Sequence, residues 1–195
     1  MPKDTFNNLN EDKKQKIFDA AVKEFSTKRF SEASINQIVK TAGIPRGSYY
    51  QYFENKEDIY LYMFERISKE KREITLHSEN IDTDADFFEI CLESTKATLE
   101  WAQHHPEYLR ISIYMEIDDS EFVTKLRASF IEKIVEFIER DKERGLIKQE
   151  TDSYLAAEMV YALIWKQSCM FISNKEKFIK RLSDGIKIIR EGIGK

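Results

Sequence analysis

Polar side chains of several kinds gather in the stretch SINQIVKTAGIPRGSYYQYFENK, residues 34–56. Arg46 can fork onto guanine, and Gln51 can pair with adenine. The hydroxyl of Tyr50 can reach bases or phosphates. Glu54 is the only carboxylate in the stretch, so little negative charge opposes a polyanion. Together these groups fit the groove edges and the backbone of double-stranded DNA.

Two short helical patterns around a tight turn would position these groups. The first opens at Ser34, a favourable N-cap, and its apolar residues recur at helical spacing up to Gly43, which suits the left-handed residue that ends a helix. Pro45 stands where a second helix would start, because its φ is already set for one. That helix, over residues 46–52, would make about two turns. The stretch is a predicted helix-turn-helix whose second helix could lie in a major groove.

We expect two kinds of DNA contact from this motif. The base-reading candidates are Arg46, Ser48 and Gln51, with Asn36 contributing from the first helix. The candidates that mainly hold phosphates are Ser34, Tyr50, Tyr52 and Lys56, and Gly47 completes the set. Lys56 stands near the start of the next helix, where backbone amides also favour an anion.

The tyrosines have a second interpretation as core residues of a small helical domain. Phe53 is expected to be core. Tyr49, Tyr50 and Tyr52 cannot all face one interior at about 100° per residue, so DNA contact is the favoured interpretation for them.

The same region resembles the TetR family of one-component bacterial transcriptional regulators, over roughly residues 11 to 60. The matching features are Ile17, Ala20, Ala21 and Phe25 in one helix, Ile38 and the turn Ala42-Gly43-Ile44, then Gly47, Tyr50 and Phe53, and finally Lys56-Glu57-Asp58-Ile59. Each feature is weak alone, but the ordered set is specific. The resemblance implies a DNA-binding regulator, by family habit a repressor, that a small-molecule effector releases from a palindromic DNA operator.

Composition agrees with an all-α protein. Of the 195 residues 42% are hydrophobic, with 13 Phe, nine Tyr and two Trp, which supplies a sizeable core. Three Pro, six Gly and the lack of a long alternating run favour helices throughout. The resemblance implies a DNA-binding domain over residues 1–56 and a helical effector-binding and dimerisation domain over residues 57–195.

Charge is divided unevenly between these two regions. The whole chain carries −4, but residues 1–56 carry +3 and residues 57–195 carry −7. A basic end on an acidic body fits a protein that touches DNA at one end. Ordinary scatter of surface charge would also give a difference of this size.

The body continues as a series of helices, the first running from about Lys56 towards His77 as a lever out of the motif. The resemblance implies that the last two helices, Asp152 to Phe171 and Lys175 to Ile193, form a four-helix dimer interface in a homodimer. The interface candidates are Leu155, Met159, Ala162, Phe178, Leu182, Ile186 and Ile189. Two-fold symmetry would place paired helices about 34–36 Å apart on the operator.

Bulky side chains with polar edges in the middle of the body suggest an effector site. The candidates are Trp101, Tyr108, Tyr114, Met115, Phe122, Phe130 and Trp165. Most would pack in the core and a minority would touch a small, largely apolar ligand. Carboxylates on the same segments leave a cationic effector as an alternative: Glu93, Glu100, Glu116 and Glu158.

The sequence fits two other functional classes less well than it fits a DNA-binding regulator. Helical bundles can hold di-iron through Glu-x-x-His, but that spacing is absent and the chain has three His. No phosphate loop or nucleophile elbow occurs, so we expect no enzyme, no metal and no cofactor. A helical interaction module without a DNA role remains the alternative.

The chain shows no feature that would direct it to a membrane. Its first residues lack the apolar core of a secretory signal, and no apolar run reaches the 18 or so residues that span a bilayer. We therefore expect a cytoplasmic protein that does not associate with membranes. Cys91 and Cys169 show no metal or redox spacing and are expected to be buried.

Overall fold

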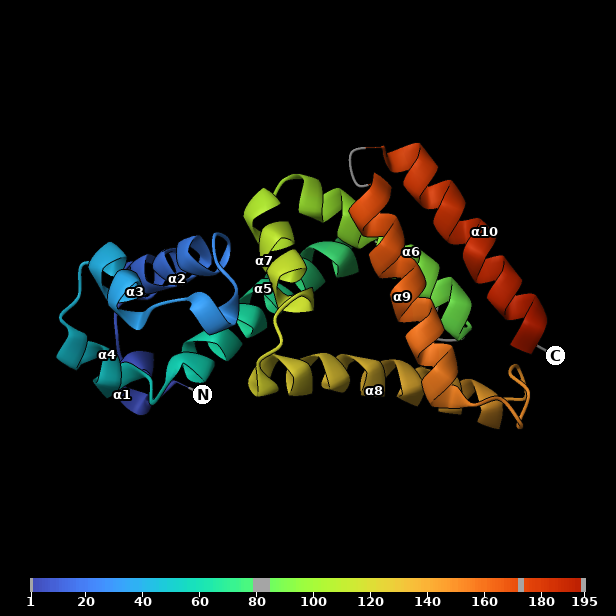
Figure 1. Cartoon of the computed structure of the whole chain (residues 1–195), viewed down its shortest axis with the longest axis horizontal. Coiled ribbons are helices and arrows are strands. Elements are labelled where there is room, and N and C mark those ends of the chain that lie inside the picture. Colours follow the sequence, from blue (N-terminus) through green and yellow to red (C-terminus); the bar gives the residue numbers. More distant parts are fainter. Residues whose placement is uncertain (1, 79–84, 172–173, 194–195) are drawn as a thin grey trace. The chain divides into compact units, whose positions relative to one another are not determined.

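The computed structural model describes residues 2–78, 85–171 and 174–193, and over these ranges the chain is helical with no strand (Figure 1). The elements are α1 (Asp4–Asn7), α2 (Glu11–Phe25), the 3-10 turn η1 (Phe30–Glu32), α3 (Ile35–Ala42), α4 (Arg46–Tyr52), α5 (Lys56–Ser78), α6 (Phe87–Gln103), α7 (Pro106–Glu116), α8 (Glu121–Glu143), α9 (Ser153–Phe171) and α10 (Lys175–Ile193). The all-α fold class is confirmed.

The chain forms two compact units. The first unit comprises Met1–Glu73 and His104–Lys125, and the second comprises Ile74–Gln103 and Leu126–Lys195. The first unit therefore contains α7 and most of α5 in addition to the helix-turn-helix. The domain boundary at residue 56 that the sequence suggested stays a prediction. The compact units have other boundaries, after Glu73 and on either side of the segment His104–Lys125.

The first unit is built around α2, which packs against α3 and α7, while α1 and α3 both contact α4. Ile17 and Phe25 on α2 and Ile38 on α3 are buried. The rings of Phe25 and Tyr60 meet edge to face with their centroids 4.7 Å apart. Each such side chain stabilises the folded unit by about 1.5–3 kcal/mol, so α3, which contacts α4, rests on a well-packed apolar base.

The turn between α3 and α4 has the backbone that its sequence predicts. Gly43 ends α3 with φ 66° and ψ 33°, a left-handed conformation that favours glycine. The N–H of Ile44 then donates to the carbonyl of Val39 at 3.1 Å, which closes the helix end. Pro45 follows with φ −62°, which suits the residue that leads into α4.

The second unit has its core between α6, α8, α9 and α10, and α9 and α10 lie side by side (Figure 1). Phe178 and Leu182 of α10 are buried in this core together with Val160 of α9. A Cβ on Gly185 would lie 2.7 Å from a methyl carbon of Leu163, so glycine allows the two helices to approach closely at this point.

A buried carboxylate ties α6 to α8 within the second unit. Asp141 is fully buried and accepts a 2.6 Å hydrogen bond from the backbone N–H of Phe87 at the start of α6. Its other oxygen pairs with Arg140 at 2.8 Å and with Arg144 at 3.0 Å. These contacts offset the cost of burying the charge, which would otherwise be several kcal/mol.

The two cysteines have different environments. Cys91 is half-buried against the core of the second unit, and burial raises the pKa of its thiol to about 11. Cys169 on α9 is exposed, so the expectation that both cysteines are buried is wrong for this one. The reason is that Cys169 lies on the outward face of a helix whose inward face makes the core.

Candidate nucleic-acid interface

One face of α4 is turned to solvent and carries most of the base-reading candidates. Arg46, Gly47 and Gln51 are exposed, and Ser48 is half-buried. Tyr50 keeps 42% of its surface exposed. Because the exposed residues recur three and four positions apart, their side chains project from the same side of the helix.

The opposite face of α4 is core. Tyr49 is fully buried and its hydroxyl donates to the carbonyl of Asn55 at 2.8 Å, while burial raises the pKa of its phenol. Tyr52 is almost fully buried, with its ring edge-on to that of Phe6. The favoured interpretation that the tyrosines contact DNA therefore fits Tyr50 alone. Tyr49 and Tyr52 lie on the apolar face of α4, which packs in the core.

A shallow groove of about 320 Å³ between the start of α3 and α4 brings several candidates together. Its lining residues are Ala33, Ser34, Ile35, Asn36, Arg46, Tyr50 and Lys56. Ser34 precedes α3 but makes no side-chain cap, and its own N–H donates to the Glu24 carboxylate at 2.9 Å. The first amides of α3 therefore have no side-chain cap, which favours an anion there beside the Arg46 guanidinium.

Lys56 has partners within the protein. Its ammonium donates to the carbonyl of Ala33 at 3.0 Å and to that of Ser31 at 3.4 Å. It also lies 4.6 Å from the centre of the Phe30 ring. Burial lowers the pKa of this ammonium. The contacts give Lys56 a structural role in joining α5 to η1 and the start of α3, and its phosphate contact stays a prediction.

Asp118, in the turn between α7 and α8, is a residue that sequence reasoning missed. The carboxylate is buried and accepts hydrogen bonds from the backbone N–H of Ser31 at 2.7 Å and of Ser120 at 2.9 Å. Burial alone would raise the pKa of Asp118, but the hydrogen bonds from Ser120 and Ser31 outweigh it, so the pKa is lowered. No local pattern indicates a bond between residues 87 positions apart.

Aromatic contacts reinforce this connection within the first unit. Phe122, at the start of α8, packs against Phe30 with ring centroids 4.7 Å apart. Tyr108 on α7 packs edge-on to Phe18 with ring centroids 6.5 Å apart, and burial raises the pKa of Tyr108 to about 12. The start of α8 is therefore packed against η1, and α7 is packed against α2.

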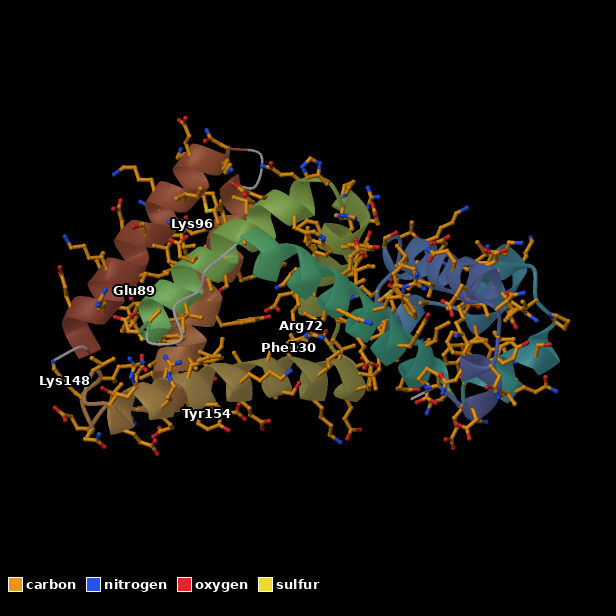
Figure 2. The ribbon with its side chains drawn as sticks, turned by 180° about the vertical axis from the view of Figure 1, so that it is seen from behind. Arg72, Glu89, Lys96, Phe130, Lys148 and Tyr154 are labelled. Atoms are coloured by element: carbon orange, nitrogen blue, oxygen red, sulfur yellow. The ribbon has the colours of Figure 1, made fainter. Side chains whose placement is uncertain are left out.

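The effector candidates are divided between the two units. Tyr108, Tyr114, Met115 and Phe122 lie in the first unit, and Trp101, Phe130 and Trp165 lie in the second. Trp101 and Met115 are buried, and the other five are half-buried. Phe130 lies on α8 (Figure 2). Since Tyr108 and Phe122 already pack against α2 and η1, their first role is structural.

The dimer candidates also fall into two groups. Leu155 and Met159 on α9 are 55% and 50% exposed, and Ala162 is exposed as well. The candidates on α10 belong to the unit's own core: Phe178, Leu182 and Ile186 are buried, and Ile189 packs against them. Phe178, Leu182 and Ile186 therefore expose little surface, and their place in a dimer interface stays a prediction. Other large apolar side chains are exposed on these helices, namely Tyr154 (Figure 2), Met170 and Ile188.

The described part of the chain contains no group of His, Cys, Asp and Glu side chains that could hold a metal ion. Among the helices described, none is both long enough and apolar enough to cross a membrane.

The exposed face of α4, the glycine-closed turn and the support from α2 define a helix-turn-helix protein. Residues 17–63 match the sequence model of the bacterial regulatory proteins of the tetR family. Over these residues the chain has the helix-turn-helix of the TetR family, and the chain is a DNA-binding transcriptional regulator.

Individual relatives agree along most of the chain. It is 26% identical over 163 residues to the HTH-type transcriptional regulator YhgD of Bacillus subtilis, which covers 79% of this chain and 83% of that one. It is 26% identical over 172 residues to the fatty acid metabolism regulator protein of Bacillus subtilis, covering 85% and 87%. The crystal structure of FadR from Bacillus subtilis in complex with stearoyl-CoA has the same fold, with a TM-score of 0.67 at 19% identity over 92% of this chain and 98% of that one. All three are regulators, which argues against an enzyme.

Replacing Lys56 tests whether its ammonium supports the fold or holds a phosphate. Lys56→Met keeps the stem over Phe30 but leaves two carbonyls without their donor, so we expect the free energy of unfolding to fall by about 1–3 kcal/mol. The slope of DNA affinity against salt should stay unchanged, because no phosphate contact is lost. Urea unfolding and binding titrations at several salt concentrations measure the two effects.

Lys40→Met is the matched control, because Lys40 is exposed on α3 and its loss should change stability by less than about 0.5 kcal/mol. A salt slope reduced by about one unit per half-site in Lys56→Met, with stability unchanged, would return Lys56 to the phosphate contacts.

Proposed function

We propose that the protein is a homodimeric repressor that binds a palindromic operator through α4 and the start of α3, and that a long-chain acyl compound releases it. The exposed face of α4, with Arg46 beside Tyr50 and the uncapped start of α3, is the observation that carries the proposal. An interaction module without a DNA role would not need this arrangement.

In this proposal the exposed residues divide the work of recognition. Arg46, Ser48 and Gln51 read base edges from α4, and Asn36 assists from α3. Ser34 and Tyr50 hold phosphates beside the uncapped amides, with Gly47 leaving room for the DNA backbone to approach. Tyr52 and Lys56 support the helices from within the protein.

The proposed dimer joins the outward faces of α9 and α10 of two chains. Leu155, Met159 and Ala162 recur four and three residues apart, so they form one stripe along α9. Ile188 adds an apolar side chain on α10 that is 71% exposed. Large exposed apolar side chains on neighbouring helices are typical of an interface, and a two-fold axis would pair the same stripe with itself.

The proposed effector class comes from the relatives. One is described as a fatty acid metabolism regulator, and another was solved with stearoyl-CoA. We infer that an acyl chain binds among apolar residues of the second unit, where Trp101, Phe130 and Trp165 are the candidates. Tyr114 and Met115 are separate candidates within the first unit. Binding would then shift α5 and α8, which contribute residues to both units.

The shift would reach the DNA-binding helices by two routes within the first unit. One is α5 itself, which Lys56 joins to the start of α3. The other is the turn after α7, where Asp118 holds the N–H of Ser31. Because packed elements change between discrete arrangements, a small displacement would alter the spacing of two reading helices as a step.

Arg46 and Gln51 provide the test of base reading. With an operator selected from random DNA, Arg46→Ala and Gln51→Ala should each cost about 1–3 kcal/mol and relax preference at one base position. Arg46→Lys is the matched control, since it keeps the charge for phosphate attraction but loses the fork that reads guanine. Competition by single-base operator variants measures the preference, and unchanged preference in all three proteins would refute α4 as the reading helix.

The dimer is tested by placing charge on the α9 stripe. Met159→Glu should lower the free energy of dimer dissociation by about 2 kcal/mol or more, because an apolar contact in the interface becomes a buried carboxylate. Sedimentation equilibrium measures the mass, and circular dichroism checks the fold. Leu146→Glu changes an exposed leucine outside α9 and α10 and should leave the dimer intact. A folded Met159→Glu protein that stays fully dimeric would rule out this face.

The effector is tested by thermodynamic linkage. Stearoyl-CoA, followed by the fluorescence of Trp101 and Trp165, should bind the free protein about 5- to 150-fold more tightly than the operator complex. Octanoyl-CoA should bind more weakly, because each buried methylene contributes about 0.8 kcal/mol, and free coenzyme A more weakly still. Equal affinity of stearoyl-CoA with and without operator would exclude acyl thioesters as the releasing ligand.

A further inference from the structure

Residues 3–6 lie outside the segment that matches the family and contact the C-terminal end of α4. They include the start of α1, which lies beside α4 (Figure 1). We call residues 3–6 the N-terminal clamp. Its contacts involve the same turn of α4 that carries Tyr50 and Gln51.

The last turn of α4 needs outside partners for its carbonyl groups. A helix leaves its last four carbonyls without an intrahelical donor, and many helices satisfy some of them with a left-handed glycine. Here the residue after α4 is Phe53, whose backbone is extended with φ −132° and ψ 148°. Its N–H satisfies only the carbonyl of Tyr49, at 2.8 Å. The carbonyls of Tyr50, Gln51 and Tyr52 still need donors from outside the helix.

The N-terminal clamp donates to each of these three carbonyls. The backbone N–H of Lys3 donates to the carbonyl of Tyr52 at 2.8 Å, and the Lys3 ammonium donates to the carbonyl of Tyr50 at 3.0 Å. The hydroxyl of Thr5 donates to the carbonyl of Gln51. The clamp thus replaces the missing glycine cap with two side-chain donors and one backbone donor.

Phe6 fixes the clamp in place by apolar packing. Its side chain is buried, with its ring centroid 4.9 Å from that of Phe53 and 4.8 Å from that of Tyr62. Burial of this phenylalanine stabilises the contact between the clamp and its surroundings in the first unit. The donors of Lys3 and Thr5 are therefore held next to α4 before DNA binds.

We propose that the N-terminal clamp is a positioning element for DNA recognition, which fixes the last turn of α4 and so determines how sharply Gln51 and Tyr50 discriminate operator sequences. The inference rests on the proposed role of α4 as the reading helix. Lys3 and Thr5 touch no base in this scheme. They act through the backbone to which the reading side chains are attached, so their loss should affect the last turn of α4 more than Arg46 in its first turn.

Thr5 allows a matched pair of variants, because its side chain is exposed and its replacement leaves the core intact. In the full-length protein, Thr5→Val removes the donor at constant shape, whereas Thr5→Ser retains it. Amide hydrogen exchange at residues 50–53 should quicken about two- to tenfold in Thr5→Val and return to the wild-type rate in Thr5→Ser. Lys3→Met should act in the same direction as Thr5→Val, and Lys180→Met, on α10, controls for the loss of charge.

Operator discrimination is measured in the same variants. At the base position whose preference depends on Gln51, Thr5→Val should lower discrimination about two- to tenfold, with the position that depends on Arg46 little changed. If Gln51→Ala shows its effect but Thr5→Val changes neither hydrogen exchange nor operator discrimination, the proposed role of the clamp is wrong and α4 remains the reading helix. If Gln51→Ala itself changes no preference, both the clamp's role and the reading assignment fail. A uniform loss of affinity in Lys3→Met, with a lower salt slope and unchanged exchange, would overturn the clamp by making Lys3 a phosphate ligand.

Discussion

A helix of seven residues does not hold its shape in water by itself, and the surroundings of α4 follow from that constraint. Isolated helices need about 12–15 residues before they are even marginally stable. Tyr49 and Tyr52 supply an apolar face that anchors α4 in the core, and Gly43 allows α3 to turn sharply into it. The exposed face can then present Arg46 and Gln51 in a fixed direction, which sequence-specific contact requires.

The same constraint explains why the first unit extends beyond the helix-turn-helix. η1 joins α2 to α3, and its backbone is held from both sides, by the Lys56 ammonium and by the Asp118 carboxylate. Both charges are at least partly withdrawn from water, so each depends on its backbone partners to offset desolvation. A change in α5 or in the turn after α7 therefore meets hydrogen bonds that are costly to break.

Sequence reasoning found the features that local chemistry determines. The turn at Gly43, the exposure of Arg46 and Gln51 and the all-α class follow from backbone preference and periodicity. Periodicity also predicts that α10 has an apolar stripe, but it does not say whether that stripe meets the chain's own core or a partner. For Leu182 the answer was the core. The role of Lys56 was likewise hidden, because its carbonyl partners come from a turn about 25 residues earlier in the chain.

The second unit shows how a core and an outward surface are made from the same two helices. Gly185 lets α9 approach α10 closely, so the inward residues of both helices are consumed in one core. The apolar side chains on the outer face of α9, Leu155 and Met159, do not stabilise the fold of a single chain, because they stay in contact with water. Close packing keeps that surface rigid. A rigid apolar stripe loses little conformational entropy when a second copy covers it, which favours a dimer whose geometry is set by the fold of each chain.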